Sequence, residues 1–133
     1  MEEFNLKSEI MKIRSHKELI VFKCSFELAL QIHLLSKSFP AEEKFSLTDQ
    51  VRRSSRSVAA NIAEAFRKRR YPKSFVSKLS DSEGEAAETQ VWLSFAQSFG
   101  YLDEKIMQDL DERYEQLEKQ LITMILSPEK WST

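Results

Sequence analysis

Apolar residues recur every three or four positions over four long segments of the chain, which is the spacing of one face of an α-helix. In the first segment the repeating positions are Leu19, Phe22, Phe26, Ala29 and His33, flanked by Val21, Leu28, Ile32 and Leu35. The later segments repeat Leu47, Val51, Val58, Ile62, Ala65 and Phe66; then Phe75, Leu79, Ser82, Ala86, Thr89, Leu93 and Ala96; then Ile106, Leu110, Tyr114, Leu117, Leu121 and Met124. The pattern predicts four amphipathic helices that each bury one stripe.

Start and stop signals place the ends of the first two helices. Ser15 and Glu18 have the spacing of a capping box, in which each side chain accepts a hydrogen bond from a backbone N–H at the start of a helix. Pro40 disfavours helical backbone at the residue before it, so the first helix is expected to end near residue 38. The second helix is predicted to begin between residues 45 and 48 and to end within the basic residues after Phe66.

The last two helices have clearer ends. Pro72 suits the first position of a helix, and Gly100 suits the position just after one. Asp103 is the expected N-cap of the fourth helix, which ends before Pro128. Because the predicted connections are short, sequential helices should be antiparallel neighbours, and the fold class is an all-α, up-down-up-down four-helix bundle.

Composition agrees with a single all-helical domain. The 133 residues include only two glycines and three prolines, too few for many tight turns, and 31% of them are charged. We assign residues 15–127 to the bundle and residues 128–133 to a C-terminal tail. Residues 1–14 are interpreted as an N-terminal arm whose order the sequence leaves open.

The sequence predicts a cytoplasmic protein with no membrane partner. No run of about 18 uncharged apolar residues is present, and the N-terminus lacks the basic start and apolar core of a secretory signal. The one cysteine, Cys24, suits a reducing compartment and is interpreted as a small packing residue.

We expect no enzymatic activity, no cofactor and no metal site. Neither His16 nor His33 has a glutamate three residues before it, as a di-iron bundle requires. Gly84 and Gly100 alone cannot form a glycine-rich phosphate loop, and no catalytic triad has a recognisable signature. His33 is interpreted as a hydrogen-bonded core or interface residue, and the aromatic residues Trp92, Phe95, Phe99 and Tyr101 as core or interface aromatics.

The second helix has three different faces. Residues 50–73 contain eight basic residues and one acidic residue, in a chain whose net charge is -1. Besides the apolar stripe, a helical wheel gives a basic stripe of Arg52, Arg56, Arg67 and, if the helix runs that far, Arg70, with Ala59 and Ala63 between them. It also gives a polar stripe of Gln50, Arg53, Ser57, Asn61, Glu64 and Lys68. A helix with three distinct faces has more than one neighbour to satisfy.

The basic residues of this segment are the candidate nucleic-acid-binding site. Arginine suits bidentate phosphate contacts, and small alanines between arginines let a rigid polyanion lie close. Because the net charge is near zero, such binding would be a local effect that weakens steeply with salt. The candidate residues are Arg52, Arg53, Arg56, Arg67, Lys68, Arg69, Arg70 and Lys73.

The polar stripe is assigned to packing instead. Gln50, Ser57, Asn61 and Glu64 contribute nothing to anion affinity, so we expect them to form hydrogen bonds between helices or subunits. Gly84 joins this packing set because small residues at Ser82, Gly84, Ala86 and Ala87 would let another helix approach closely.

Three segments also carry a resemblance to known proteins. They are Phe39-Pro40; Gln50-Val51-Arg52-Arg53 with Ser57 to Phe66; and Leu79 through Glu88-Thr89-Gln90-Val91-Trp92-Leu93. Over roughly residues 15–126 the chain resembles the bacterial four-helix-bundle proteins encoded in the intervening sequences of 23S rRNA genes. It departs from them at Ala65, where the family usually has glycine, and at Gly84-Glu85, where it usually has Gly-Ser.

That family is similar to the accessory variability determinants of diversity-generating retroelements, which form pentameric rings, bind nucleic acid and associate with a reverse transcriptase. The resemblance therefore implies a homo-pentamer that faces RNA or DNA, with a reverse transcriptase left open as a partner. It brings no catalytic residues. The departure at Ala65 lets the second helix continue further into the basic cluster.

The function hypothesis is a non-enzymatic oligomeric accessory protein that contacts nucleic-acid phosphates through the second helix. The alternative is a protein-interaction adaptor whose basic face pairs with an acidic partner or a neighbouring subunit. Residues 81–118 carry eleven acidic and two basic residues and could face the basic helix of the next subunit. Binding to a membrane surface ranks last, because the sequence shows no basic face set against a bulky exposed apolar one.

Overall fold

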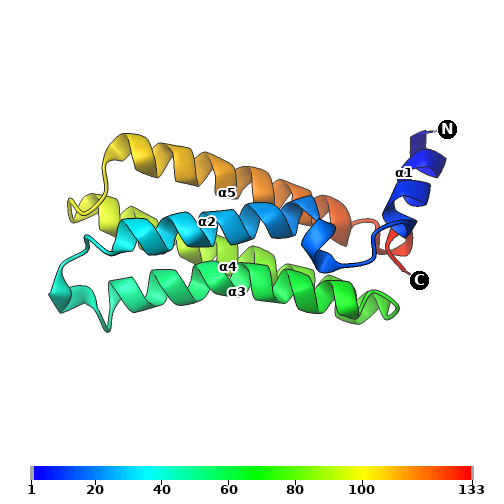
Figure 1. The fold of residues 1–133 in the computed structure, drawn as a ribbon, viewed down its shortest axis with the longest axis horizontal. Coiled ribbons are helices and arrows are strands. Elements are labelled where there is room, and N and C mark those ends of the chain that lie inside the picture. The colour runs from blue at the N-terminus through cyan, green and yellow to red at the C-terminus, as the bar shows by residue number, and fades with distance from the viewer. Residues whose placement is uncertain (1, 133) are drawn as a thin grey trace.

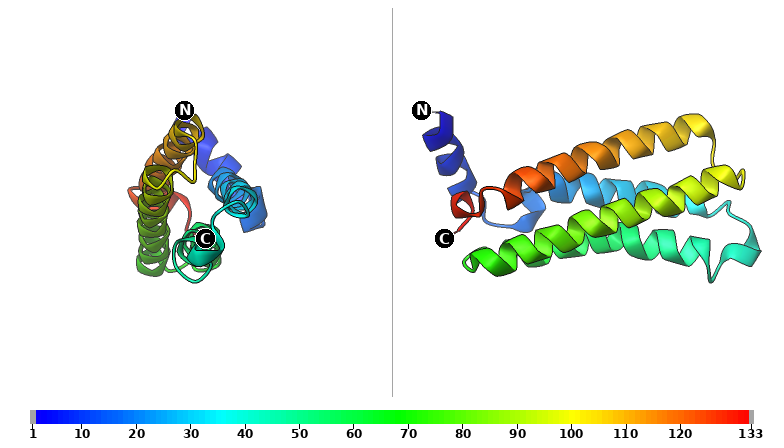
Figure 2. Two further views of the ribbon diagram at one scale, coloured as in Figure 1. Left: turned by 90° about the vertical axis from the view of Figure 1, so that its left-hand side faces the viewer. Right: turned by 180° about the vertical axis from the view of Figure 1, so that it is seen from behind.

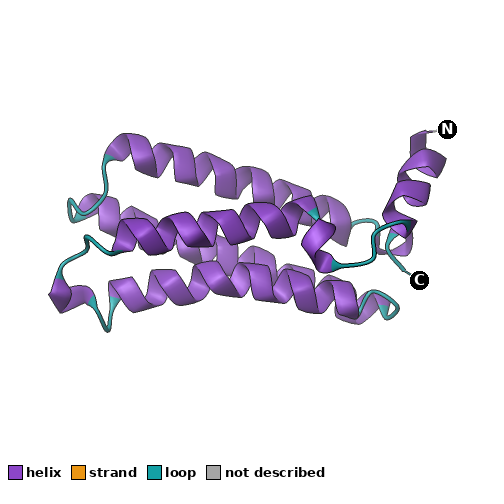
Figure 3. Ribbon diagram, viewed as in Figure 1, coloured by secondary structure: helices purple, strands orange, loops and turns teal. Residues whose placement is uncertain are grey.

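The chain folds into four long helices that lie side by side. The structure is a computed structural model that describes residues 2–132. The long helices are α2 (Ile20–Ser36), α3 (Leu47–Arg67), α4 (Pro72–Ser98) and α5 (Glu104–Ile125) (Figure 1). Figure 3 shows helices and loops but no strand among the described residues. The fold is all-helical and bundle-like, as the sequence predicts.

Sequential helices run antiparallel and pack as neighbours (Figure 1). The α3–α4 contact is the most extensive, α4 packs next on α5, and α2 packs on α3 and more lightly on α5. Figure 2, seen along the bundle, places α2 and α4 on opposite sides of α3. None of the helices in residues 2–132 combines the length and hydropathy of a membrane span.

The first predicted helix is interrupted, which the sequence does not predict. The Ser15–Glu18 capping box forms, but it caps the one-turn 3₁₀ helix η1 (His16–Glu18). Leu19 then has an extended backbone with ψ 132°, which buries its side chain and ends the turn. The long helix α2 therefore begins at Ile20 and not at Ser15.

The predicted buried face of α2 is wrong in part, because this helix has two neighbouring apolar stripes. The core takes Val21, Ser25, Leu28, Ile32 and Ser36, whereas Phe26 of the predicted stripe is 51% exposed. Ser25 and Ser36 can be buried because each hydroxyl donates to a carbonyl of its own helix, at 2.9 and 3.0 Å. The serines thus occupy core positions of α2, while Phe26 is exposed and Phe22 packs half-buried against the core.

The other predicted core stripes are confirmed almost throughout. Every predicted apolar position of α3 and α4 is buried, as are five of the six in α5; Met107 replaces Ile106 there. The buried polar residues of α4 bond across the contact with α3. Ser82 Oγ donates to Val58 O at 2.8 Å, and Thr89 Oγ1 lies 2.8 Å from Ser54 Oγ.

Both ends of the chain add structure to the bundle. Residues of the predicted arm form α1 (Glu2–Met11), and two further 3₁₀ turns occur, η2 (Ala41–Glu43) and η3 (Pro128–Lys130). Trp131 of the tail packs on the core, with its ring 6.3 Å from that of Phe75. In Figure 1, α1 and η3 lie at the same end of the bundle as the turn between α3 and α4.

A half-buried carboxyl on α5 makes the stability of the bundle depend on pH. Glu118 Oε2 is buried and has no hydrogen-bond partner among the described residues. Burial first, and then the negative charges of Glu115, Glu83 and Asp111, raise the pKa of Glu118 from 4.5 to about 7. The folded chain thus holds this proton more tightly than the unfolded chain, and stability is lost as the pH rises from about 4.5 to about 7.

We therefore predict that Glu118→Gln stabilises the bundle at pH 8 and much less at pH 5. After discounting for solvent screening, the gain at pH 8 is about 1 kcal/mol, or roughly 4 °C in Tm. Thermal unfolding followed by circular dichroism at both pH values measures it. Glu112→Gln, at an exposed position on the same helix, is the control. If Glu118→Gln raised Tm equally at pH 5 and pH 8, the prediction would be wrong.

Candidate nucleic-acid interface

The basic residues predicted as one site lie in two places along α3. Arg52, Arg53 and Arg56 lie in the N-terminal half of the helix, and Arg52 and Arg56 bond to residues at the end of α2. α3 ends at Arg67, so Lys68, Arg69 and Arg70 lie in the turn that leads to α4, and Lys73 lies in the first turn of α4. The predicted continuous stripe from Arg52 to Arg70 therefore stops at Arg67.

Arg52 is used within the bundle. Its Nε donates to Ser36 Oγ at 2.7 Å, and its Nη2 donates to His33 O at 3.5 Å. Both partners lie in the last turn of α2, where unpaired carbonyls and the helix dipole favour a cation. Arg52 thus fixes the end of α2 against α3.

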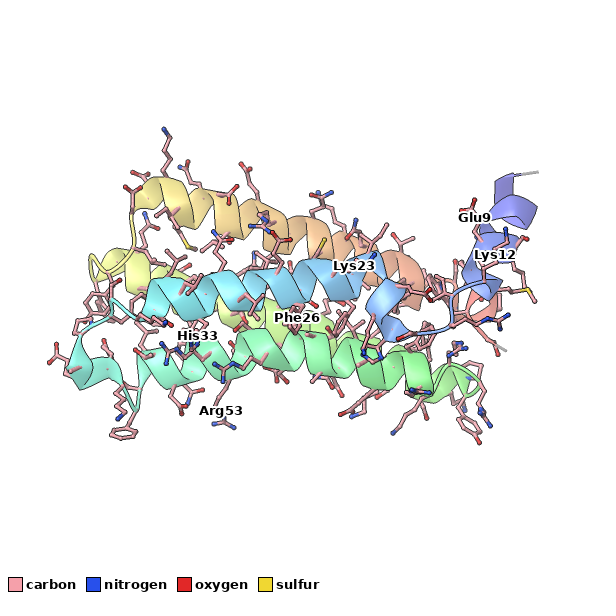
Figure 4. The ribbon with its side chains drawn as sticks, in the orientation of Figure 1. Glu9, Lys12, Lys23, Phe26, His33 and Arg53 are labelled. Carbon is pink, nitrogen blue, oxygen red and sulfur yellow. The ribbon has the colours of Figure 1, made fainter. Side chains whose placement is uncertain are left out.

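Arg56 is held by a histidine. Arg56 Nη2 lies 3.2 Å from His33 Nδ1, and because a guanidinium only donates, Nδ1 is the acceptor and the ring proton is on Nε2. Burial, followed by the charges of Arg52, Lys37 and Arg56, lowers the pKa of His33, which favours this neutral form. Figure 4 shows His33 lying between α2 and α3, as expected for a histidine that bonds to both helices.

Arg69 folds back on the end of α3. Its Nη1 donates to Phe66 O at 3.0 Å, and its guanidinium lies 3.9 Å from the centre of the Phe66 ring. Burial, and then the charges of Arg67, Arg70 and Arg14, lower the pKa of Arg69. Arg69 thus holds the turn in shape at the centre of a group of like charges.

The other five candidates are exposed, and none has a hydrogen bond or an ion pair with a described residue; they are Arg53, Arg67, Lys68, Arg70 and Lys73. Figure 4 shows Arg53 pointing away from the bundle. The charges of Arg67 and Arg70 act on Arg69, and we name Arg67, Lys68, Arg69, Arg70 and Lys73 the basic turn. The four exposed side chains of this turn can reach an anion.

Arg14 is a basic residue that the sequence does not assign to the site. It is exposed, and its charge acts on Arg69 although 55 positions separate them in the chain, from 14 to 69. Its position depends on the connection between α1 and α2, which has no periodicity to read. Because this segment has no amphipathic pattern, the sequence does not predict that Arg14 lies near the basic turn.

The packing candidates divide between three environments. Glu64 Oε2 forms an ion pair with Lys78 Nζ of α4 at 2.9 Å, whereas Asn61 donates only to Ser57 of its own helix. Gln50 and Ser57 line a shallow cavity of about 420 Å³ between α3 and α4. Gly84 is exposed, and a Cβ built there would meet nothing within 4 Å. Within the chain, therefore, Gly84 does not mark a close helix contact.

Comparisons with known proteins match the chain to one protein family and to a solved structure. Residues 17–123 match the 23S rRNA-intervening sequence protein family. The crystal structure of a protein of unknown function from the S23 ribosomal protein family of Bacteroides thetaiotaomicron VPI-5482 is similar, with a TM-score of 0.72 and 31% identity. The match covers 80% of this chain and 95% of that chain. No curated protein matches.

The difference between bonded and free arginines is open to measurement. We predict that Arg52→Ala lowers the free energy of unfolding by about 1–2 kcal/mol, because Ser36 and the end of α2 lose their charged partner. Arg53→Ala, next along the helix and exposed, should change it by less than about 0.5 kcal/mol. Urea unfolding measures the free energy of unfolding of both variants. Equal losses would mean that the Arg52 contact contributes nothing to stability.

Proposed function

The chain belongs to the 23S rRNA-intervening sequence protein family, and we propose that it is a non-enzymatic, oligomeric accessory protein that binds nucleic acid. The observation that carries this proposal is the basic turn, where the exposed side chains of Arg67, Lys68, Arg70 and Lys73 and the half-buried Arg69 gather within residues 67–73 at one end of the bundle. A folded chain gains nothing from concentrating like charges in this way, because they repel each other. A polyanion offsets that repulsion.

The chemistry of the free residues suits phosphate. Arg67 and Arg70 each present a planar fork of donors that matches two phosphate oxygens, and Lys68 and Lys73 add point charges. The turn lies between the carboxyl end of α3 and the start of α4 at Pro72, so the basic side chains and the N-terminal dipole of α4 can both attract an anion. Contacts of this kind position a nucleic acid without reading its bases.

Arg53 extends the proposed surface along α3, and Arg52, Arg56 and Arg69 have supporting roles. Arg52 and Arg56 fix α2 against α3, and Arg69 shapes the turn. The resemblance to retroelement accessory proteins adds a reverse transcriptase to the proposed partners and a pentamer as the proposed assembly. A protein-interaction adaptor is the second candidate, and an exposed apolar groove between α2 and α3 favours it.

The test is a double charge reversal at the basic turn. Wild-type chain should bind a structured RNA or a DNA duplex in fluorescence anisotropy, with an affinity that falls steeply between about 50 and 200 mM salt. The double variant Arg67→Glu/Arg70→Glu should weaken binding at about 50 mM salt by at least about 100-fold. The slope of log affinity against log salt concentration should become shallower by about two, because about two phosphate contacts are lost.

The matched control is Lys105→Glu with Lys119→Glu, which changes the net charge equally on exposed positions of α5. We expect it to bind within a few-fold of wild type. No binding by wild type at low salt would overturn the proposal. An equal loss in both double variants would also overturn it, because binding would then follow net charge and not the turn.

A further inference from the structure

The outer side of α2 leaves an apolar groove that the chain does not fill. Phe22, Phe26 and Leu30 form one wall, and Ala59 and Ala60 of α3 form the floor of a groove of about 520 Å³. Phe26 and Leu30 are 51% and 53% exposed. Apolar surface gathered in a concave site usually marks a binding site in a soluble protein.

A convex apolar stripe lies on another helix. Val91 and Phe95 of α4 and Phe99, the residue that caps its end, repeat every four residues, so they form one line along the outer face of the helix. They are 50%, 46% and 55% exposed, and the rings of Phe95 and Phe99 lie 5.9 Å apart. We call these three residues the aromatic ridge.

The ridge of a chain cannot reach the groove of the same chain. α2 and α4 lie on opposite sides of α3, as Figure 2 shows, and each packs on α3 and α5. A concave groove placed against a second groove would leave a void, whereas a ridge of side chains would fill it. The groove and the ridge therefore fit as two different surfaces between two chains.

Charge favours the same pairing. Arg56 is the charged residue that lines the groove, whereas Arg53 lines the separate cavity between α3 and α4 with Glu85 and Glu88 of the same chain. Beside the ridge, residues 81–98 of α4 carry four acidic residues and no basic one, and Glu88 lies three residues before Val91. Opposite charges at the rim of an apolar contact set its orientation and disfavour wrong partners.

We propose that the groove between α2 and α3 of one copy binds the aromatic ridge on α4 of a second copy. This inference rests on the oligomer of the proposed function and names its two surfaces. The contact is heterologous, so each added copy leaves one groove and one ridge free, and addition continues until the ring closes. In a closed ring all copies are related by rotation, so their basic turns lie on one rim and can bind one polyanion together.

Two exposed substitutions test the pairing. Leu30→Asp places a charge in the groove, and Phe95→Asp places one on the ridge; neither side chain belongs to the core of the chain. Each variant alone should be a 15.6 kDa monomer in sedimentation velocity, where wild type forms larger species. Ile122→Asp, an equally apolar change on α5, is the control and should assemble like wild type.

Mixing the two variants gives the decisive result. The intact ridge of Leu30→Asp meets the intact groove of Phe95→Asp, so an equimolar mixture should form a dimer and nothing larger. A monomeric wild type, a Phe95→Asp variant that assembles normally, or a mixture that stays monomeric would each overturn the proposal. Circular dichroism checks that each variant is folded. If an aspartate unfolds the bundle, the single variants Leu30→Ser and Phe95→Ser, alone and mixed, repeat the test.

RNA anisotropy on the same samples separates this inference from the proposed function. Monomeric variants that still bind RNA at low salt, more weakly than wild type, would support both proposals. A wild type that forms a ring but does not bind RNA would keep the groove and ridge contact and overturn phosphate binding. A monomeric wild type that binds RNA would overturn the groove and ridge contact and keep phosphate binding.

Discussion

Two buried hydroxyls fix α3 against α4, and the rest of the structure depends on that contact. Ser82 donates to the carbonyl of Val58, and Thr89 lies within hydrogen-bond distance of Ser54, so small polar residues let the two backbones approach closely. Thr89 Oγ1 also has Glu85 O of its own helix at 2.8 Å, so it is Ser82 whose buried hydroxyl would lose its partner if the helices slipped. That loss would cost about 1–3 kcal/mol and favours this one register of the two helices. The ion pair between Glu64 and Lys78 adds a contact near the turn.

This register determines which surfaces of α3 remain for other uses. With one face against α4 and another against α2, the exposed part of α3 carries Arg53, Arg56 and Ala60, and its end carries the basic turn. Arg52 closes the contact with α2 by bonding Ser36. Because α3 packs on both α2 and α4, its remaining surface provides the floor of the groove beside α2 and, at its end, the basic turn.

The sequence predicts α3, α4 and α5 well because each has a single apolar stripe, and Pro72 and Asp103 also mark the starts of α4 and α5. It fails on α2, because periodicity cannot choose between two neighbouring apolar stripes, and Phe26 lies outside as a result. It also cannot separate bonded from free arginines. Arg52 and Arg53 look alike in the chain, and only the position of Ser36, 16 residues away, makes one structural.

We propose that assembly and nucleic-acid binding use separate surfaces: the apolar groove and aromatic ridge for assembly, and the charged basic turn for nucleic acid. Sedimentation velocity of wild-type chain with a labelled RNA, across a salt series, tests it most directly. Apolar contacts strengthen slightly with salt and phosphate contacts weaken, so RNA should be released while the protein keeps its assembled sedimentation coefficient. Protein that falls to monomer as the RNA leaves, or RNA that never co-sediments at low salt, would contradict the account.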